Sequence, residues 1–406
     1  MSRQDGLSQW ITTVSTQMPH LSRPQARVLA LWSYGIVLTQ SCGLTTVATF
    51  LALLLGKQPG ALRQQRREWC YAAADKKGRQ RQEVPVPSCC IALLRWVLAW
   101  WPREERRVVV ALDATTLGQR FTVLALSVVY RGCALPVAWV VVPATHKGAW
   151  RPHWEGLFTL LHGSVPADWT VLVLADRGLY ARWLYRQIVR RGWHPFLRIN
   201  QGGLLRPHAE RGFRSLGTAA PRVGTRWSGT VDCFVTRECR LVCTLLACWE
   251  APYAEPWLIV TDLPPQGADV AWYGMRSWIE CGFKDNKRGG WQWQQTKMTD
   301  PARANRLWLA LAVATLWVVS VGGEADATLP ASSLERLSPR HVARQQVRLQ
   351  QRTRPRLLSC FRRGVLTILA ALITGQDLPL GRFHPEPWPV CPPLVVAPLR
   401  PREQAA

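Results

Sequence analysis

Acidic residues are scarce in this sequence. Its 406 residues include 26 Asp and Glu against 51 Lys and Arg, which gives a formal net charge of +25. The positive charges repel one another, and a neutral partner would not offset this repulsion. The excess of basic residues therefore favours a polyanionic partner. Nucleic acid is the first candidate and an anionic membrane surface the second. No basic amphipathic helix dominates the sequence, which speaks against the membrane surface.

The sequence also lacks a clear membrane span and a secretory signal. Its best apolar run, "LWLALAVATLWVVSVGG" from Leu307, is short for a span and follows Arg303 and Arg306. We therefore expect a buried core helix there and no membrane partner. The N-terminal twenty residues have neither the apolar block nor the small-residue cleavage site of a secretory signal. These absences predict a cytoplasmic protein.

The twelve cysteines form no CxxC pair. Cys239, Cys243 and Cys248 lie in an alternating apolar pattern that is typical of a strand, which favours buried free thiols over a zinc site. The 22 tryptophans are unusual, and we expect most of them in the core or in interfaces. Some of them can instead stack on nucleic-acid bases. No internal repeat at a solenoid period is present.

The first hundred residues have helical patterns. Residues 22–40 begin with a Ser cap and an early Pro, as helix starts do. Residues 44–56 and 58–74 predict two further helices around a tight Gly-Lys turn, which is the outline of a helix-turn-helix. The second helix carries three candidate DNA contacts, Arg63, Arg66 and Arg67. An ordinary helical hairpin with solvated arginines fits the same pattern.

From residue 107 onward the pattern changes to strands. Residues 107–118 and 121–144 predict three strands in a meander, with a turn at Arg131-Gly132. A helix around 154–163 then leads to a strand–helix–strand unit over residues 170–200. This is the strand order of an RNase H-like sheet, an α/β fold with both faces covered. Short strands with Gly and Pro turns then predict a β-rich insertion before the helix that contains Glu280.

These patterns divide the chain into five parts. They are an N-terminal helical DNA-binding domain (1–88), a connecting helix (89–106), an RNase H-like catalytic domain (107–322) with its β insertion at about 200–262, a C-terminal helical region (323–378) and a Pro-rich tail (379–406). Helices are expected at 301–320 and 356–375, with a linker at 322–333 between them.

Two aspartates stand where predicted strands end. Asp113 follows the first strand and Asp176 the fourth, at the end of the strand where α/β sheets place their chemistry. Each aspartate alone fits a turn residue or a helix cap. In the RNase H-like order the first and fourth strands are neighbours, so the two side chains meet. Two facing carboxylates repel unless a cation lies between them.

The stretch "WYGMRSWIECGFKDNKRGG" (272–290) supplies a third acid. In an α-helix, Tyr273, Arg276, Glu280 and Lys287 fall within about 60° of one face, and the apolar side chains lie on another side. A solvated face with an Arg276–Glu280 ion pair fits this spacing. Gly282 and the following "RGGWQW" predict that the helix bends or ends soon after Lys287.

The three acids together predict a metal site. Asp113, Asp176 and Glu280 are hard oxygen ligands that suit two Mg²⁺ or Mn²⁺ ions, which activate a water or a 3′-hydroxyl at a phosphodiester. The neighbouring Arg276 and Lys287 are suited to holding the phosphates of a nucleic-acid strand. On this interpretation, one helix face carries both the acid and the contacts to its substrate.

At these positions the sequence resembles the DDE transposases of bacterial insertion sequences. It is similar to insertion sequence family four, in the branch whose signature is Tyr-x2-Arg-x3-Glu-x6-Lys. "YGMRSWIECGFKDNK" matches that signature without a deviation in spacing, and "ALDATTL" and "LADRGLY" match the two Asp motifs. The resemblance is specific over residues 107–300 and looser elsewhere.

The resemblance implies a role for each matching residue. Asp113, Asp176 and Glu280 would be the catalytic, metal-binding triad. The residues expected to contact DNA near the cleaved end are Tyr273, Arg276, Lys284 and Lys287. Trp257, in "EPWLIVTDLP", matches a tryptophan that meets a flipped base in relatives. A core tryptophan in an apolar strand fits that position equally well.

The implied activity is cut-and-paste transposition on double-stranded DNA. A homodimer would pair two transposon ends and insert them into target DNA, with the N-terminal helices reading terminal inverted repeats. By analogy with relatives, excision would use a DNA hairpin, and the protein would be nucleoid-associated in the bacterial cytoplasm. Two alternatives are an inactive or domesticated transposase that only binds DNA, and an RNase H-type nuclease that cleaves without dependence on end sequence.

Overall fold

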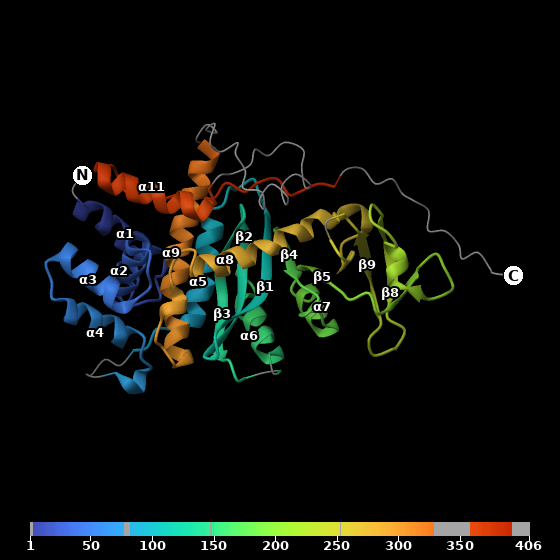
Figure 1. The fold of residues 1–406 in the computed structure, drawn as a ribbon, viewed down its shortest axis with the longest axis horizontal. Coiled ribbons are helices and arrows are strands. Elements are labelled where there is room, and N and C mark those ends of the chain that lie inside the picture. The colour runs from blue at the N-terminus through green and yellow to red at the C-terminus, as the bar shows by residue number, and fades with distance from the viewer. Residues whose placement is uncertain are drawn as a thin grey trace.

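The computed structural model describes residues 3–76, 82–146, 148, 150–251, 253–328 and 358–391. A ten-stranded mixed sheet occupies the centre of the molecule, with a group of N-terminal helices at one end (Figure 1). The predicted mixed α/β class is therefore confirmed. Parts of two predicted segments lie outside the described residues, the linker from 329 and the Pro-rich tail from 392, as do residues 77–81 of the predicted N-terminal domain.

The N-terminal part is helical, as its patterns predict. The helices are α1 (Arg3–Gln17), α2 (Arg23–Thr39), α3 (Leu44–Leu55), α4 (Pro59–Trp69) and α5 (Val86–Ala99), with a short 3₁₀ turn, η1 (Ala73–Asp75), after α4. Ser22 caps α2 in a capping box with Gln25, which explains where this helix starts. The predicted connecting helix begins earlier than expected, at Val86, because Pro87 suits the first turn of α5.

The first five strands form the half of the sheet next to these helices. They are β1 (Arg107–Leu117), β2 (Phe121–Tyr130), β3 (Cys133–Pro143), β4 (Thr170–Ala175) and β5 (His194–Arg198), in the spatial order β3-β2-β1-β4-β5. β1 pairs with β2 in antiparallel and with β4 in parallel orientation. The predicted turn between β2 and β3 is present, with φ of 48° at Arg131 and 79° at Gly132. Positive φ at both positions is what a two-residue hairpin turn requires.

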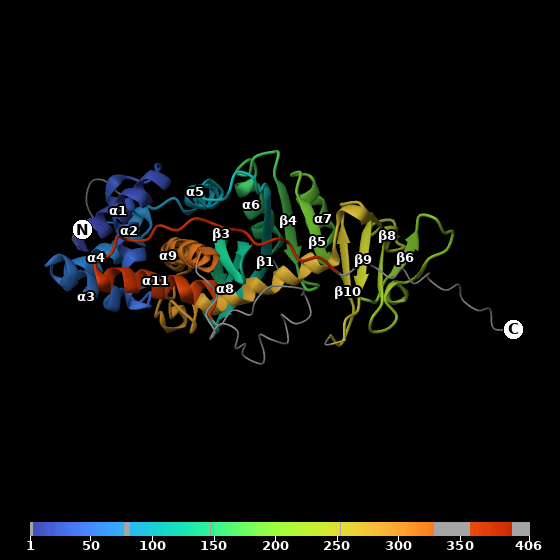
Figure 2. The same ribbon diagram turned by 90° about the horizontal axis from the view of Figure 1, so that it is seen from above.

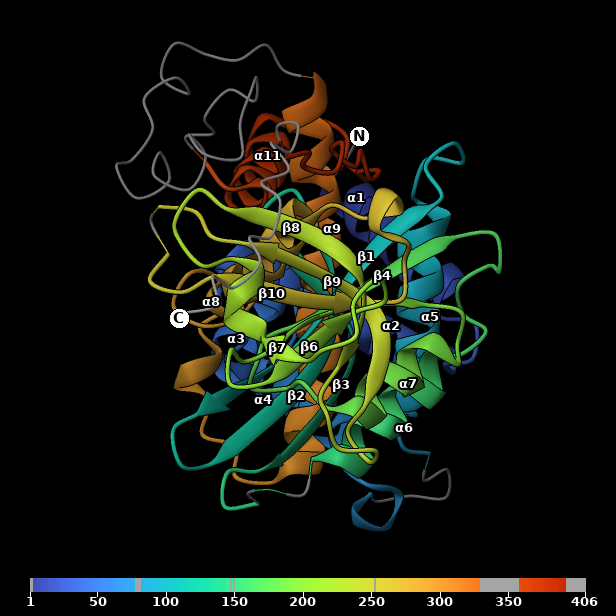
Figure 3. The ribbon, with the colours of Figure 1, turned by 90° about the vertical axis from the view of Figure 1, so that its right-hand side faces the viewer.

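The β-rich segment continues the same sheet. Its strands are β6 (Leu204–Pro207), β7 (Arg214–Ser215), β8 (Arg226–Cys233), β9 (Leu241–Cys248) and β10 (Trp257–Thr261). Two 3₁₀ turns, η2 (Leu216–Ala219) and η3 (Pro265–Gly267), follow β7 and β10. β10 pairs antiparallel with β5, which joins this segment to the first five strands. Figure 3 looks onto this end of the sheet.

Helices cover both faces of the first five strands (Figure 2). α5, α6 (Arg151–Leu161) and α7 (Arg182–Val189) lie on one side, and α8 (Trp278–Asn286) lies on the other. α9 (Pro301–Thr328) lies along the β3 edge of the sheet. Burial on both faces explains why β2 is apolar along most of its length and buried throughout.

Helix α9 passes through the core between the N-terminal helices and the sheet (Figure 1). By length and composition it is the one described helix long and apolar enough to cross a membrane, but 94% of its most apolar window is buried in the protein. This burial agrees with the predicted core helix. The helix continues to Thr328, so the predicted linker does not begin at Gly322.

Close contact with α11 (Cys360–Thr374) explains the glycines in α9. A Cβ on Gly322 would lie 1.9 Å from the Cys360 carbonyl oxygen, and one on Gly364 would lie 1.8 Å from the Val318 carbonyl oxygen. Gly322 of α9 and Gly364 of α11 therefore allow the two helices to touch through their backbones, and Gly323 makes room for the Tyr130 side chain. The glycines of "VGG" do not end the helix.

Candidate active site

The two predicted aspartates lie on adjacent parallel strands. Ala111 of β1 is in register with Leu174 of β4. Asp113 and Asp176 each follow two residues later, so they stand side by side just beyond the paired part of the strands. The expectation that β1 ends at Asp113 is wrong, because β1 continues to Leu117 along β2.

The segment that carries Glu280 is not one α-helix. It begins as a 3₁₀ helix, η4 (Val270–Ser277), and becomes α8 at Trp278. Residues three apart lie above one another in a 3₁₀ helix, so Tyr273 and Arg276 still share a side. α8 ends at Asn286, one residue before Lys287. Gly282 does not break the helix, since it allows α8 to pack against Ala134 of β3, 2.8 Å from where its Cβ would be.

Arg276 joins the three predicted acids. Its Nη2 atom lies 2.7 Å from Asp113 Oδ2 and 3.4 Å from Asp176 Oδ2, and its Nη1 atom lies 2.5 Å from Glu280 Oε1. The structure thus brings all three acids around one guanidinium, from β1, from the end of β4 and from α8. The ion pair between Arg276 and Glu280 belongs to this larger cluster and is not an isolated surface pair.

Backbone amides hold the other oxygen of each aspartate. Asp113 Oδ1 accepts from its neighbour, the amide of Ala114, at 2.7 Å. Asp176 Oδ1 accepts from the amides of Gly178 and Leu179 at 3.0 and 3.2 Å, which is the turn role that an isolated aspartate predicts. Both carboxylates are therefore fixed with one oxygen turned toward Arg276.

Burial and charge act in opposite directions on these groups. Burial raises the pKa of the Asp113 carboxyl, although the Arg276 guanidinium acts to lower it. Burial also acts to lower the pKa of Arg276, but Asp113 and the other nearby acids outweigh it, and the pKa is raised. The Arg276 side chain is 15% exposed and that of Glu280 is 62% exposed. Glu280 is therefore the most solvent-accessible of the three acids.

The donor set of this cluster fits a divalent cation. Three carboxylates surround one guanidinium, so they carry more negative charge than Arg276 neutralises, and their oxygens are the ligands that Mg²⁺ and Mn²⁺ prefer. The sequence predicts that the three acids lie directly around a metal ion. Among the described residues, however, no three His, Cys, Asp or Glu side chains are close enough to share an ion. Arg276 lies between the acids instead.

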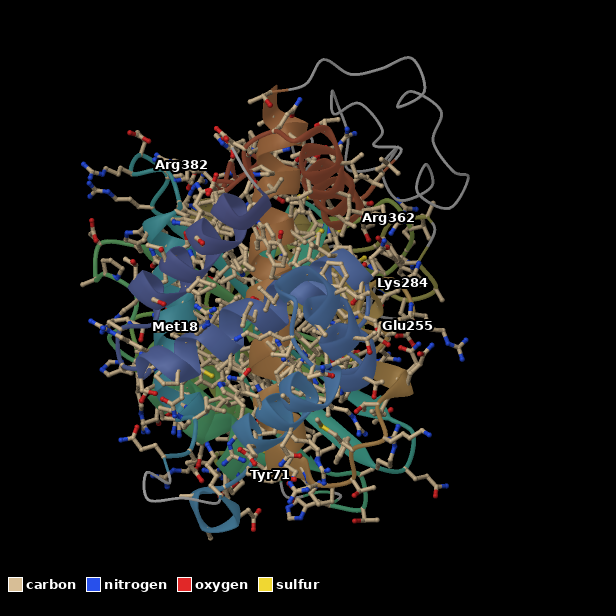
Figure 4. All side chains as sticks on the ribbon, turned by 90° about the vertical axis from the view of Figure 1, so that its left-hand side faces the viewer. Met18, Tyr71, Glu255, Lys284, Arg362 and Arg382 are labelled. Atoms are coloured by element: carbon tan, nitrogen blue, oxygen red, sulfur yellow. The ribbon has the colours of Figure 1, made fainter. Side chains whose placement is uncertain are left out.

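The other residues of the predicted signature line the same region. Lys287 Nζ donates to Thr115 Oγ1 at 2.7 Å and to the Thr116 carbonyl at 2.9 Å, and burial lowers its pKa. Tyr273 is buried, which raises its pKa to about 12. Lys284 is exposed at the periphery of the molecule (Figure 4).

Trp257 belongs to an aromatic group beside the acids. Its ring lies 5.2 Å from Tyr273 and 4.8 Å from Tyr253, measured between centroids. Trp257 is half-buried and Tyr253 is 40% exposed. The group therefore presents partly accessible rings at the start of β10, the strand that precedes η4.

The N-terminal arginines do not share one environment. Arg63 and Arg67 are exposed on α4, but Arg66 is fully buried and donates to the Leu62 carbonyl at 2.8 Å. The prediction of Arg66 as a DNA contact is therefore wrong for this structure. Arg66 lies four residues after Leu62, so its side chain is on the apolar face of α4. The neighbouring arginines in the sequence made this helix face difficult to recognise.

Two arginines beside the acids were missed by sequence reasoning. Arg177, directly after Asp176, pairs with Glu255, and Arg198 at the end of β5 lies 3.8 Å from the same carboxylate. Arg198 also contributes to the charge environment of Tyr273. Both arginines lie at the ends of β4 and β5, on the edge of the sheet that carries Asp176. This position after a predicted strand could have identified them from the sequence as neighbours of the acids.

Residues 104–317, just over half of the chain, match the model of the transposase DDE domain family. The chain belongs to this family. The matched span contains all three acids of the cluster and the whole ten-stranded sheet. None of the curated proteins compared with the sequence matches it. Among solved structures, a piggyBac transposase synaptic complex with hairpin DNA is similar at 9% identity and a TM-score of 0.34, over 77% of this chain and 78% of that one.

Proposed function

We propose that this protein is a metal-dependent cut-and-paste DNA transposase of insertion sequence family four, in the branch with the Tyr-x2-Arg-x3-Glu-x6-Lys signature. The observation that carries the proposal is the cluster of Asp113, Asp176 and Glu280 around Arg276, within a chain of the transposase DDE family. The strand order β3-β2-β1-β4-β5 supports an RNase H-like catalytic sheet.

In this proposal the three acids hold Mg²⁺ or Mn²⁺, and their residual negative charge supports that role. Two such ions, when bound, polarise the scissile phosphate and lower the pKa of an attacking water or 3′-hydroxyl. The chain itself orients Asp113 and Asp176 through backbone amides, which leaves Oδ2 of each available once Arg276 moves. Arg276 then contacts the DNA phosphates that approach the acids.

The substrate is proposed to be double-stranded DNA bearing terminal inverted repeats, followed by target DNA. Lys284 and Lys287 lie in or beside α8, so they suit phosphates near the cleaved bond. Trp257 is placed to stack on a base displaced from the duplex end, since part of its ring is accessible. Arg63 and Arg67 on α4 are the remaining candidates for contacts of the N-terminal region with the terminal repeats.

We also propose that two copies act together on two paired ends, in the bacterial cytoplasm at the nucleoid. Cleavage of both ends of one element at the same time needs an active site at each end, and this consideration supports the dimer. Excision through a DNA hairpin remains part of the proposal by analogy with relatives.

The test is cleavage by the purified full chain. Its substrate is DNA taken from the flanks of the coding region that contains the inverted repeats, incubated with Mg²⁺ or Mn²⁺. The wild type should nick or excise this DNA, and Asp113→Asn should reduce the rate by at least about a thousandfold, since metal ions and their ligands provide most of the transition-state stabilisation. Binding of the same DNA in a bandshift should survive the substitution.

Three outcomes distinguish the candidates. If Asp113→Asn cleaves as fast as the wild type, the assignment of the acids is wrong. Binding without cleavage by the wild type, under either metal ion, supports the alternative of an inactive or domesticated DNA-binding protein. Cleavage that proceeds equally on DNA without the repeats supports a general nuclease.

A further inference from the structure

A basic groove that contains no residue of the acidic cluster lies between α7 and the turn that joins β8 to β9. It has a volume of about 540 Å³. Five arginines line it: Arg182, Arg186, Arg190, Arg237 and Arg240. The remaining lining residues are Tyr185, Val189, Leu241 and Val242, so no acidic residue is among them. None of these residues takes part in the proposed active site.

Two of the arginines make contacts at the groove: Arg182 joins its two walls, and Arg240 bonds within the β8–β9 turn. Arg182 on α7 donates to the backbone carbonyl of Glu238 in the β8–β9 turn. Arg240 donates to the Val235 carbonyl at 3.0 Å and lies 5.8 Å from the Phe213 ring. The Arg182 contact joins the turn to α7 through a neutral carbonyl, and Arg240 also contributes to the charge environment of Asp232.

The other three arginines are unpaired. Within the part of the chain that the structure describes, the side chains of Arg186, Arg190 and Arg237 are exposed and have no hydrogen bond or ion pair. Like charges gathered around one groove repel each other, and burial of aliphatic stems does not offset that repulsion. A bound anion with several negative charges would offset it.

The spacing of the arginines on α7 suits a phosphate chain. Arg182 and Arg186 on α7 and Arg190 at its C-terminal cap are four residues apart, so they lie on one side of the helix at steps of about 6 Å. One strand of duplex DNA presents a phosphate every 3.4 Å along its axis, so alternate phosphates fall within reach of successive arginines. Arg237 extends the basic surface from the opposite wall.

The groove favours a duplex over a single strand. Binding of single strands relies on exposed aromatic rings that stack on bases, and Tyr185, the one aromatic residue in the lining, is buried. The exposed Val189 and Val242 offer apolar contact to sugars and no hydrogen bond to a base edge. Recognition here would therefore depend on the backbone and be independent of base sequence.

We propose that this groove binds the phosphate backbone of duplex DNA without sequence preference, at a site separate from the acidic cluster. The proposal rests on the proposed function only in taking DNA as the partner. In this proposal the groove contacts DNA outside the terminal repeats. This binding does not depend on DNA cleavage.

The test measures binding of the full chain to a fluorescent 30-base-pair duplex of random sequence across a range of salt concentrations. The variant Arg186→Ala/Arg190→Ala/Arg237→Ala removes the three unpaired cations. Its affinity at 0.1 M salt should fall at least about tenfold, and the slope of log K against log salt should become shallower by about 2.7, because each phosphate contact contributes about 0.9.

A matched control removes three other exposed arginines, Arg95→Ala/Arg103→Ala/Arg211→Ala, and changes the net charge equally. It should keep most of the affinity and of the salt slope. Arg186→Lys/Arg190→Lys/Arg237→Lys should restore binding, since lysine also binds phosphate as a point charge. Thermal melts of all the variants establish that they are folded.

Several results would overturn the proposal. They are equal losses in the groove and control variants, a loss limited to a single-stranded probe, and a loss limited to duplexes that carry the terminal repeats. Failure of the cleavage assay is a separate result: if the wild type cleaves nothing but the groove variant loses duplex binding, the catalytic proposal fails and the groove assignment stands.

Discussion

At the scale of single residues, Arg276 is the internal counter-ion of the acidic cluster. It contacts Asp113, Asp176 and Glu280, and its guanidinium is mostly buried. A divalent cation bound by the same acids would compete with it for the same oxygens. We therefore expect metal binding to be coupled to release of Arg276 toward DNA, because the metal ion would then neutralise the carboxylates in place of the guanidinium.

The substitution Arg276→Gln tests this coupling without an activity assay. Removal of Arg276 leaves the mostly buried Asp113 carboxylate without its cation, so we expect a loss of roughly 3 kcal/mol in the free energy of unfolding without metal. Addition of 10 mM Mg²⁺ should then raise the melting temperature of the variant more than that of the wild type, since the competitor is gone.

The control combines this change with Asp113→Asn and Asp176→Asn. Without the two aspartates, the added stabilisation by Mg²⁺ should disappear. If Mg²⁺ raises the melting temperature of the triple variant as much as that of Arg276→Gln, the ion binds elsewhere.

Asp285 in α8 provides a pH-dependent prediction. Burial raises its pKa to about 7, although Lys284 acts to lower it. The unfolded chain loses this proton near pH 4 but the folded protein keeps it to about pH 7. Its stabilising contribution is therefore complete below pH 4 and is lost as pH rises through 7. Asp285→Asn should raise the free energy of unfolding by about 2–4 kcal/mol at pH 8 and by little at pH 4.

Denaturant unfolding at both pH values measures this difference. The exposed Asp168→Asn, which pairs with Arg106 on the surface, serves as the control. It should show a much smaller dependence on pH in this range. Equal effects of Asp285→Asn at pH 4 and pH 8 would contradict a raised pKa.

At the scale of secondary-structure elements, strand order was more predictable than helix geometry. The RNase H-like order of the predicted strands placed the first and fourth strands side by side, and β1 does pair with β4. The apolar runs indicated only that each strand is buried on both faces. The spacing of Tyr273, Arg276 and Glu280 predicted that they lie close together, and in the structure Arg276 contacts Glu280 while Tyr273 contributes to the charge environment of Arg276. The 3₁₀ geometry of η4 was not predictable, since it depends on packing that a spacing of three or four residues does not reveal.

Burial was the least predictable property of individual polar residues. Arg66 and the exposed Arg67 are adjacent in one basic run, yet only one of them lies inside. The position of Arg276 between three acids also depends on long-range contacts, which join residues 100 and 163 positions apart. No local pattern contains that information.

The contact between α9 and α11 gives a prediction at this scale. A Cβ on Gly364 would overlap the Val318 carbonyl oxygen, so Gly364→Ala must push the two helices apart. We expect a loss of about 2–3 kcal/mol in the free energy of unfolding. Denaturant unfolding with a matched control, Gly156→Ala in α6, separates this effect from helix propensity.

Gly156 has no atom within 4 Å of the added Cβ. Its replacement should stabilise the protein by about 0.5–1 kcal/mol, because alanine favours the helix. A loss of stability in Gly156→Ala, or none in Gly364→Ala, would show that the close approach of α9 and α11 is not what the glycines permit.

At the scale of the whole molecule, the N-terminal helices and the sheet share one core. Trp317 of α9 stacks on Trp10 of α1 at 4.4 Å and on Tyr34 of α2 at 5.8 Å between ring centroids. α9 also packs against β3 on its other side. The sequence suggested a separate N-terminal domain because its patterns change near residue 107, but a change of pattern does not reveal whether two parts bury a common surface.

This shared core predicts that disturbance of Trp317 spreads to both parts. Trp317 is fully buried, so Trp317→Ala should cost about 3–5 kcal/mol. Because aromatic side chains of α1 and α2 pack on Trp317, we expect faster hydrogen exchange in α1 and α2 as well as in α9 and β3. If the N-terminal helices depended only on their own contacts, hydrogen exchange in α1 and α2 would stay at the wild-type rate. Trp227→Ala in β8, far along the sheet from α1, should leave α1 and α2 unchanged, and equal effects of the two substitutions on α1 would contradict a core centred on α9.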